Sequence, residues 1–332
     1  MKTREKLLNF LQSAGNGWVS GETIGTELHV SRAAVWKAVM QLRQDGFMID
    51  AVRNKGYRLA DETDSLSEIG ILKYLDPGNR FLDIHIVPET MSTNALLWEK
   101  ANAGAPEGTV LIASMQTDGK GRMGRKFYSP AETGIYMSIL LRPKMKEAKN
   151  GIKLTTIAAV AASETFEAAS GNPVKIKWVN DIFMNNKKVC GILTEGSLSL
   201  ETGYLETVVL GIGINVYQPE NGFPPEIADI AGAVFDRKLT DGRNILAAGF
   251  LNRFISRYIN GDFESSAAEY RRRSLVTGKE IMVIKTDGKR KAFVKDIDDH
   301  CCLVVQYEDG MIETLSAGEI SIEQYEDEKN EK

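Results

Sequence analysis

The sequence has little cysteine and no long apolar run. Its three cysteines, Cys190, Cys301 and Cys302, are odd in number and two of them are adjacent, so we expect no disulfide scaffold and a reducing compartment. The most apolar long segment, 154–169, is interrupted by threonine, serine and glutamate, which excludes a membrane span. No small-residue cleavage site follows the charged start of the chain, so we expect no secretory signal and a cytoplasmic protein.

Histidine is also scarce, and no internal repeat of fixed period is present. The three histidines, His29, His85 and His300, belong to no recognisable Ser-His-Asp or Cys-His set, so we expect them to be structural or exposed. What remains is an ordinary globular composition, 43% apolar and 26% charged. At about 150 residues per domain, 332 residues indicate two or three domains.

The charge is unevenly distributed along the chain. Residues 1–60 carry nine Lys and Arg against five Asp and Glu, a net charge of +4, although the whole chain has a net charge of −4. A small basic domain on an acidic body is expected when only that domain binds a polyanion. A chance excess of four charges is the alternative.

The first 60 residues have the pattern of a winged helix. Three helices are predicted at 2–14, 20–28 and 31–46, with Ser20 and Ser31 as N-caps, followed by a hairpin with a basic tip at 53–56. We expect the third helix to enter a DNA major groove and the hairpin to contact phosphates. Trp36 lies on the flank of that helix, where it can either pack against the core or contact DNA. For the domain as a whole, the alternative is a winged helix that contacts only protein. The predicted DNA-binding residues are Arg32, Trp36, Lys37, Gln41, Lys55 and Arg58.

Polar, acidic residues 60–67 form the clearest linker in the sequence. Beyond them, helical stretches (92–102, 154–170, 243–260) mix with strand-like stretches (109–114, 135–141, 189–195, 207–214) in irregular order, which predicts an α+β domain with a mixed sheet. From Thr277 onward, short strands separated at 287–288, 298–299 and 309–310 predict a small β domain, followed by a frayed acidic end at 326–332. The predicted domains are therefore 1–62, 67–272 and 277–325.

The motif with the clearest chemistry is the loop 117–125, TDGKGRMGR. Its three glycines let the backbone approach a ligand, and its three cations suit a phosphate or carboxylate. The spacing is not that of a P-loop. A flexible surface hairpin is the alternative for the loop taken alone.

Further motifs stand next to strand-like sequence. They are Ser92-Thr93-Asn94, KWVND at 177–181, KKVCGIL at 187–193 and GIGIN at 211–215. Taken alone, the hydroxyls of Ser92-Thr93-Asn94 are better explained as a helix cap. Taken together, these motifs closely resemble the catalytic core of biotin protein ligases, usually written GRGRxGR, KWPND, a lysine with a nearby glycine, and G-x-G-x-N. The departures are Lys120 for an arginine, Val179 for proline and Phe127 for tryptophan. Only Lys120 touches the expected ligand site, where lysine keeps the charge but loses the bidentate fork.

The resemblance covers essentially the whole chain and points to the bifunctional bacterial type, which also represses biotin genes. It implies a class II synthetase-like catalytic domain between a winged helix-turn-helix and an SH3-like β-barrel. It also implies ATP with Mg²⁺, biotin as substrate, biotinyl-5'-AMP as intermediate and corepressor, and transfer of biotin to a lysine of biotin carboxyl carrier protein. Operator DNA and a ligand-promoted homodimer are the other implied partners, and neither a membrane nor a dedicated protein metal site is expected.

The resemblance also implies roles for single residues. The catalytic residues are Arg122, Lys188 and Asp181, with Asp181 orienting or deprotonating the acceptor lysine; a turn-forming Asn-Asp pair is the alternative for Asp181. The biotin-binding residues are Ser92, Thr93, Asn94, Gln116, Gly119, Lys120, Gly121, Arg122, Lys188 and Gly191. The nucleotide-side residues are Arg122, Arg125, Asn180, Lys188 and Asn215.

Two other functions stay open on the sequence alone. A biotin-sensing repressor could keep the fold and lose the chemistry, although Arg122, Asp181 and Lys188 argue against it. A lipoyl-type or other acyl-adenylate transferase could share the core, although the complete loop and the KWVND segment argue against that. Trp18, Trp98 and Trp178 are expected in the core rather than as ligand platforms.

Overall fold

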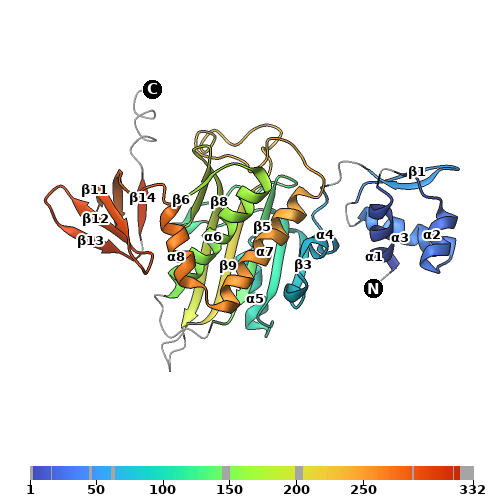
Figure 1. Ribbon diagram of the computed structural model, residues 1–332, viewed down its shortest axis with the longest axis horizontal. Coiled ribbons are helices and arrows are strands. Elements are labelled where there is room, and N and C mark those ends of the chain that lie inside the picture. The colour runs from blue at the N-terminus through green and yellow to red at the C-terminus, as the bar shows by residue number, and fades with distance from the viewer. Residues whose placement is uncertain are drawn as a thin grey trace. The chain divides into compact units, whose positions relative to one another are not determined.

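The computed structural model describes residues 3–15, 17–44, 47–60, 64–143, 150–198, 205–285, 288–316 and 318–321 (Figure 1). The chain forms two compact units, one of residues 1–76 with 235–249 and the other of residues 77–234 with 250–332. The helix α7 (Gly242–Asn260) begins in the first unit and ends in the second. Among the described residues, no helix is long and apolar enough to cross a membrane.

The first unit begins with the predicted helix-turn-helix and hairpin. Its elements are α1 (Thr3–Ser13), α2 (Gly21–Leu28), α3 (Arg32–Gln44), β1 (Ile49–Val52) and β2 (Gly56–Leu59). The side chains of Ser20 and Ser31 cap α2 and α3, accepting hydrogen bonds from the backbone N–H of Thr23 at 3.0 Å and Ala34 at 3.2 Å. The predicted inner face of α3, Val35, Ala38, Val39 and Leu42, is buried against the leucines of α1. The winged-helix prediction is confirmed in its elements.

The described end of the predicted linker is packed rather than free. Asp64 is buried and receives three hydrogen bonds from Arg243 at the start of α7, two of them to its carboxylate at 2.9 Å. Residues 61–63 lie outside the described residues. The short helix α4 (Glu68–Tyr74) follows, capped by the side chain of Ser67. At least one acidic residue of the stretch 60–67, Asp64, therefore forms an internal ion pair.

The second unit is built on a seven-stranded sheet. Its strands are β3 (Asp83–Thr90), β4 (Thr109–Gln116), β5 (Gly134–Leu141), β6 (Val174–Lys177), β7 (Asp181–Met184), β8 (Lys187–Leu198) and β9 (Leu205–Asn215). The spatial order is β3-β4-β5-β9-β8-β7-β6, with β3 and β4 parallel and every other pair antiparallel. The predicted mixed sheet is therefore confirmed, while β6 and β7, only four residues each, were not predicted.

Helices cover the two faces of this sheet (Figure 1). On one face, α5 (Thr93–Asn102) buries Leu97 against β4, β5 and β9. On the other face lies α6 (Asn150–Ser170), where Thr155 shares a 2.8 Å hydrogen bond with Thr194 of β8. The helix α8 (Phe263–Arg272), which was not predicted, packs against α6. Because side chains alternate along a strand, the neighbours of Thr194 in β8 point to the α5 face.

The end of the chain forms a second, antiparallel sheet of five strands, as the turn signals predicted. The strands are β10 (Glu280–Lys285), β11 (Gly288–Ile297), β12 (Leu303–Tyr307), β13 (Ile312–Leu315) and β14 (Glu319–Ser321), in the order β13-β12-β11-β10-β14. The predicted turns at 298–299 and 309–310 lie between strands. Asp287 and the predicted frayed end at 326–332 lie outside the described residues.

Candidate functional site

A pocket of about 990 Å³, counting its open mouth, gathers the sequence motifs on the α5 face of the large sheet. The start of α5, the end of β4, the glycine-rich loop, β7, β8, β9 and the segment before β14 all contribute to its wall. Its lining residues are Ser92, Thr93, Asn94, Gln116, Lys120, Gly121, Arg122, Met123, Arg125, Lys126, Phe127, Lys177, Trp178, Asn180, Asp181, Lys188, Gly191, Ile192, Leu193, Gly211, Ile212, Gly213, Gly318, Glu319 and Ile320.

One end of the pocket is a buried network of hydroxyls and amides. The Gln116 carbonyl oxygen Oε1 accepts hydrogen bonds from the backbone N–H and the hydroxyl of Thr93, at 2.8 and 3.1 Å. The Gln116 amide donates to Ser129 Oγ at 3.0 Å. Ser92, although it is the N-cap residue of α5, makes no side-chain cap hydrogen bond. The helix-cap explanation for the Ser92 hydroxyl is therefore wrong.

Asn94 is held rigidly in the same network. Its side-chain Nδ2 donates to Glu195 Oε2 at 2.7 Å, and its Oδ1 lies 2.6 Å from Ser138 Oγ. A Cβ atom at Gly211 would lie only 2.2 Å from Asn94 Oδ1, so glycine at this position in β9 is what makes room for the amide. The buried amides and hydroxyls can bind a small polar ligand group in one fixed orientation.

The glycine-rich loop is a tight turn closed by backbone hydrogen bonds. Gly121 N–H donates to Arg125 O at 2.7 Å, and Phe127 N–H donates to Gly119 O at 2.8 Å. The turn between them contains Met123 at a φ of 55°. The Arg125 side chain forms an ion pair with Glu319 of β14. The loop thus presents its cations to the pocket, as its composition predicted.

Four side chains at the centre of the pocket form two charged or polar pairs. Lys188 Nζ lies 2.7 Å from Asp181 Oδ1, with both side chains about a quarter exposed. Arg122 Nη1 donates to Asn180 Oδ1 at 3.4 Å, and the Asn180 amide is fixed by a 2.9 Å bond to Ile192 O. Burial lowers the pKa of Arg122 below its ordinary value, partly offset by Asp181. The centre is suited to binding anions, because two partly buried cations lie next to the polar network.

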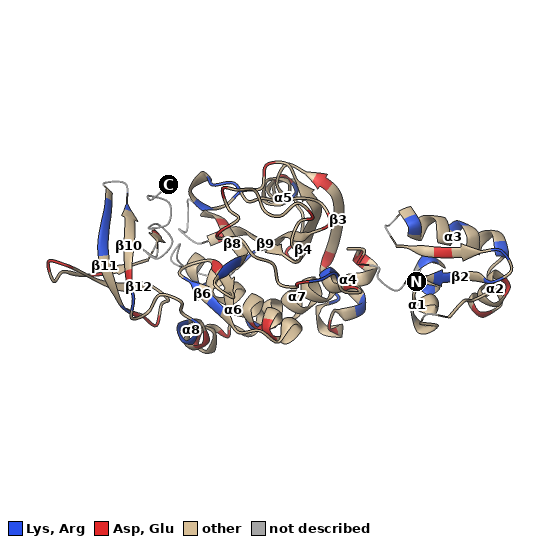
Figure 2. Cartoon of the chain, turned by 90° about the horizontal axis from the view of Figure 1, so that it is seen from above, with Lys and Arg blue, Asp and Glu red and all other residues tan. Residues whose placement is uncertain are grey.

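The residues predicted to contact nucleic acid belong to α3 and the hairpin, whose lysines and arginines are coloured blue in Figure 2. Arg32, Trp36, Lys37, Gln41 and Lys55 are all exposed. Trp36 is 59% exposed, so it is not packed in the core. Arg58 is half-buried and bonded to Asp50 at 2.7 Å, with its guanidinium 4.9 Å from the centre of the Trp18 ring. The basic surface therefore belongs to the two elements that a winged helix uses on DNA.

Three family models match the chain in order. They are an HTH domain at residues 3–58, the biotin/lipoate A/B protein ligase family at 86–215 and a biotin protein ligase C-terminal domain at 276–322. A bifunctional ligase/repressor BirA from Bacillus spizizenii is 35% identical over 324 residues, which cover 95% of this chain and 97% of that protein. The chain belongs to the bifunctional ligase/repressor family.

Two further comparisons agree with this family. A biotin–[acetyl-CoA-carboxylase] ligase from Mycobacterium tuberculosis is 31% identical, covering 73% of this chain and 90% of that protein. The solved structure of a biotin protein ligase from Aquifex aeolicus, in complex with biotin and ATP, superposes with a TM-score of 0.60 at 27% identity, covering 72% of this chain and 97% of that one.

In this ligase/repressor family member, the pocket lining includes all but two of the ligase-side residues predicted from the motifs. Gly119 of the glycine-rich loop is outside the lining, and a Cβ at this position would meet Phe127 O and Ser129 Oγ at 2.6 Å. Asn215 donates instead to Gly232 O at 3.0 Å, outside the lining. Trp178 is 4% exposed and also lines the pocket, and the partly buried Trp98 of α5 packs against the core. The prediction of a core position is wrong for Trp18, which is only partly buried.

The motifs missed one contributor to the pocket, the segment before and within β14. Gly318, Glu319 and Ile320 line the pocket although they are about 200 residues away from the glycine-rich loop in sequence. No local pattern in the last domain marks them. Ser138 and Glu195, which fix Asn94, were also missed, because a single polar residue within an apolar strand forms no pattern that indicates a binding site.

Among the described residues, no group of three or more His, Cys, Asp or Glu side chains is placed to hold a metal ion. Asp181 has Lys188 as its charged neighbour.

Proposed function

We propose that the chain is an ATP-dependent biotin protein ligase that also acts as a biotinyl-AMP-responsive repressor of biotin genes. The observation that carries this proposal is the convergence of Gln116 and Asn94 with Arg122, Lys188 and Asp181 in one pocket. The comparison supports it, since the same motifs run through a chain similar over its whole length to a bifunctional ligase/repressor.

Biotin would lie with its ureido head in the buried network of hydroxyls and amides. That network offers both donors and acceptors in fixed positions, and a ureido group needs both. Phe127 also lines the pocket, so the expectation that only Lys120 of the three departures touches this site is wrong. The Phe127 ring forms an apolar wall beside Gly213, where a Cβ would lie 2.5 Å from the ring. The proposed biotin-contacting residues are Ser92, Thr93, Asn94, Gln116, Gly119, Lys120, Gly121 and Gly191.

The biotin carboxylate would attack the α-phosphorus of ATP. A carboxylate oxygen forms the new bond to phosphorus, and the bond to the bridging oxygen breaks, so pyrophosphate leaves with its electron pair. No protein nucleophile takes part, and the residues act by aligning two anions and neutralising their charge. Lys120, Arg122 and Lys188 are the cations in place for this, and magnesium bound with ATP supplies further neutralisation of the phosphates.

The nucleotide would lie toward Arg125, Asn180 and Asn215. Arg125 is paired with Glu319, so a phosphate that binds Arg125 competes with that carboxylate. Asn215 is tied through Gly232 to the segment that crosses the start of β8, where Lys188 N–H donates to Ile230 O at 2.7 Å. This segment therefore connects the nucleotide side to the strand that carries Lys188.

In the second step, a lysine of the biotin carboxyl carrier protein would attack the biotinyl carbonyl, and AMP would leave. Asp181 is the proposed residue that orients or deprotonates the acceptor amine. Its carboxylate lies 2.7 Å from Lys188 Nζ, in the centre of the pocket. An acceptor ammonium would compete with Lys188 for this carboxylate.

The winged helix would bind operator DNA through the exposed face of α3 and the hairpin. Lys37 and Gln41 face the bases, Arg32, Lys55 and Arg58 face phosphates, and the exposed Trp36 is free to contact a base edge. Two-fold operators require a dimer, and we propose that biotinyl-AMP drives it through the catalytic domain. We expect this function to operate in the cytoplasm, where ATP, carrier protein and operator DNA occur together.

We assign the DNA-binding domain to residues 1–62, the catalytic domain to 67–272 and the SH3-like β domain to 277–325. The family models at 3–58, 86–215 and 276–322 support this division. The contact pattern divides the chain differently, because residues 67–76 and 235–249 belong with the first unit and the proposed catalytic and SH3-like domains otherwise share the second.

Ligase activity is tested by incubating the purified protein with labelled biotin, MgATP and a biotin carboxyl-carrier domain. Label on the acceptor lysine, located by mass spectrometry, is the expected result. Biotin binding without adenylate or product would support the sensor-only repressor instead. No biotin binding would contradict both functions.

Repressor function is tested by sedimentation and DNA binding with and without biotinyl-AMP. We expect the mass to double with the ligand and operator affinity to rise with it. An unchanged mass at saturating biotinyl-AMP would refute ligand-driven dimerisation.

A further inference from the structure

The KWVND segment is held by residues that follow it by about 90 to 120 positions. The hydroxyl of Tyr270, on α8, donates to Val179 O at 2.9 Å. The Trp178 indole Nε1 donates to Cys301 O at 2.9 Å, in the turn between β11 and β12. The Ile176 N–H donates to Arg273 O, also at 2.9 Å. Two of these bonds hold the segment itself and the third holds Ile176, the residue before it, and all three come from α8, the residue after it, or the small sheet.

Tyr270 occupies a position that no motif marks. Its side chain is completely buried, and burial raises the pKa of its phenol well above the ordinary value, with Cys301, Arg122 and Asp181 as its electrostatic neighbours. The hydroxyl is therefore protonated at neutral pH and donates a hydrogen bond to Val179 O. Its hydrogen-bond acceptor, Val179, directly precedes Asn180 and Asp181, which line the pocket.

The bonded carbonyl belongs to the peptide that leads into Asn180. Asn180 Oδ1 contacts Arg122, and Asp181 contacts Lys188, so the next two residues of the chain position all four polar side chains at the pocket centre. A shift of Val179 O displaces both pairs together, and small displacements of reacting groups reduce rates steeply.

We propose that Tyr270 is a positioning residue for both half-reactions, acting through Val179 O on Asn180 and Asp181. This role rests on the proposed ligase function. An ordinary core tyrosine would also satisfy its hydroxyl on a carbonyl, but its loss would lower stability and ligand affinity together. A positioning role lowers the rate while biotin binding persists, because Val179 does not belong to the hydroxyl and amide network.

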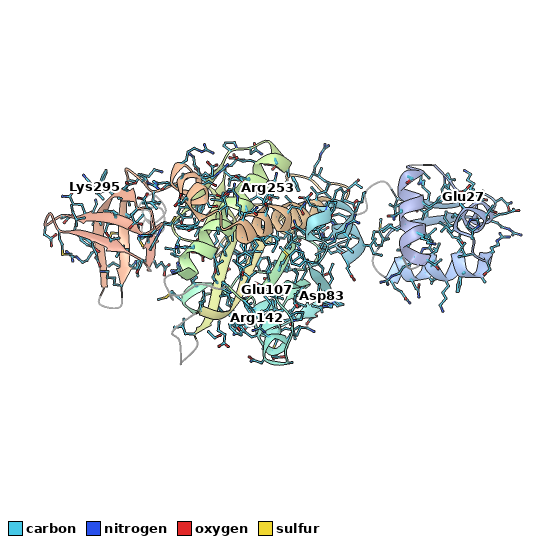
Figure 3. The ribbon with its side chains drawn as sticks, turned by 60° about the horizontal axis from the view of Figure 1, so that its bottom comes forward. Glu27, Asp83, Glu107, Arg142, Arg253 and Lys295 are labelled. Carbon is cyan, nitrogen blue, oxygen red and sulfur yellow. The ribbon has the colours of Figure 1, made fainter. Side chains whose placement is uncertain are left out.

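The test is Tyr270→Phe, which removes one oxygen atom and keeps the ring. Tyr258→Phe is the control, because Tyr258 is a partly buried phenol whose hydroxyl likewise donates to an oxygen of the protein, Glu107 Oε1, at 2.7 Å. Glu107 also accepts the backbone N–H of Arg142, and Figure 3 shows these two labelled residues close together. This corner lies at the start of β4, whereas the pocket lies at its end.

Three quantities are measured for each full-length variant: biotin-dependent ATP–pyrophosphate exchange, transfer from synthetic biotinyl-AMP to a carrier domain, and the melting temperature. For Tyr270→Phe we expect kcat to fall about tenfold or more in both half-reactions. The KM for biotin should stay within about twofold and the melting temperature close to that of Tyr258→Phe. Tyr258→Phe should retain the full kcat.

An unchanged kcat for Tyr270→Phe overturns the positioning role alone. A fall in kcat that is matched by loss of biotin affinity and by a lower melting temperature also overturns it, in favour of a general structural role. Absence of exchange and transfer in the unsubstituted protein overturns the proposed ligase function, and this role with it.

Discussion

Replacing Gly211 by alanine should damage the biotin end of the pocket by adding a single methyl group. The new Cβ would lie 2.2 Å from Asn94 Oδ1, and ordinary contacts begin at 3.4 Å, so the amide oxygen must move by about 1.2 Å. Asn94 cannot rotate freely, because its amide is held by Glu195 at 2.7 Å and faces Ser138 at 2.6 Å. Losing both hydrogen bonds, at about 1 kcal/mol each, should lower the free energy of unfolding by about 2 kcal/mol. The displaced amide also loses its proposed hydrogen bond to biotin, which at about 1.4 kcal/mol corresponds to about tenfold weaker biotin binding.

The assay is isothermal titration with biotin, together with thermal unfolding. Gly151→Ala is the control, because a Cβ on Gly151, in α6, would meet no other part of the described chain within 4 Å. It should leave biotin affinity unchanged and raise the free energy of unfolding by up to about 1 kcal/mol. Biotin affinity within threefold of the parent in Gly211→Ala would refute the argument that Asn94 is held in place and binds biotin.

Three further predictions concern the charged residues. Lys188→Ala should abolish adenylate formation, because it removes a cation from the pocket centre; near-normal pyrophosphate release by the variant would contradict this. Lys120→Arg should slow release of biotinyl-AMP several-fold by restoring a bidentate donor, and an unchanged release rate in a rapid-filtration assay would disprove it. Arg273→Met should lower the free energy of unfolding at pH 7 by about 3 kcal/mol, since a 4% exposed guanidinium pairs with two carboxylates at 2.6 and 2.7 Å. Hydrogen bonds from Arg272 and Arg273 lower the pKa of Glu269 to about 2 from its ordinary 4.5, so its stabilisation is complete above pH 4.5 and is lost as the pH falls toward 2. When denaturant unfolding is measured as a function of pH, the difference in free energy of unfolding between Arg273→Met and the parent should therefore shrink in acid. A difference that stays constant would contradict the ion pairs as its source.

Local patterns predicted the elements whose formation depends mainly on nearby residues. Ser20 and Ser31 mark helix starts by hydrogen bonds that span three residues, and the apolar face of α3 follows from its own periodicity. The strands β6 and β7 were missed, because four residues carry too little alternation to separate them from loops. The acidic stretch at 60–67 was predicted as a linker, since its composition gave no sign that Arg243 would pair with Asp64.

The sequence alone determined the chemical types that the site would contain, because the glycine-rich loop, KWVND and GIGIN each place specific side chains a few residues apart. Only the tertiary structure decided which side chains meet. Glu195 and Ser138 fix Asn94 from two different strands, and Glu319 reaches Arg125 from the last sheet. Tyr270 bonds to Val179 across 91 residues of chain. Hydrogen bonds act over about 3 Å in space without regard to separation along the chain, so contacts of this kind leave no local pattern in the sequence.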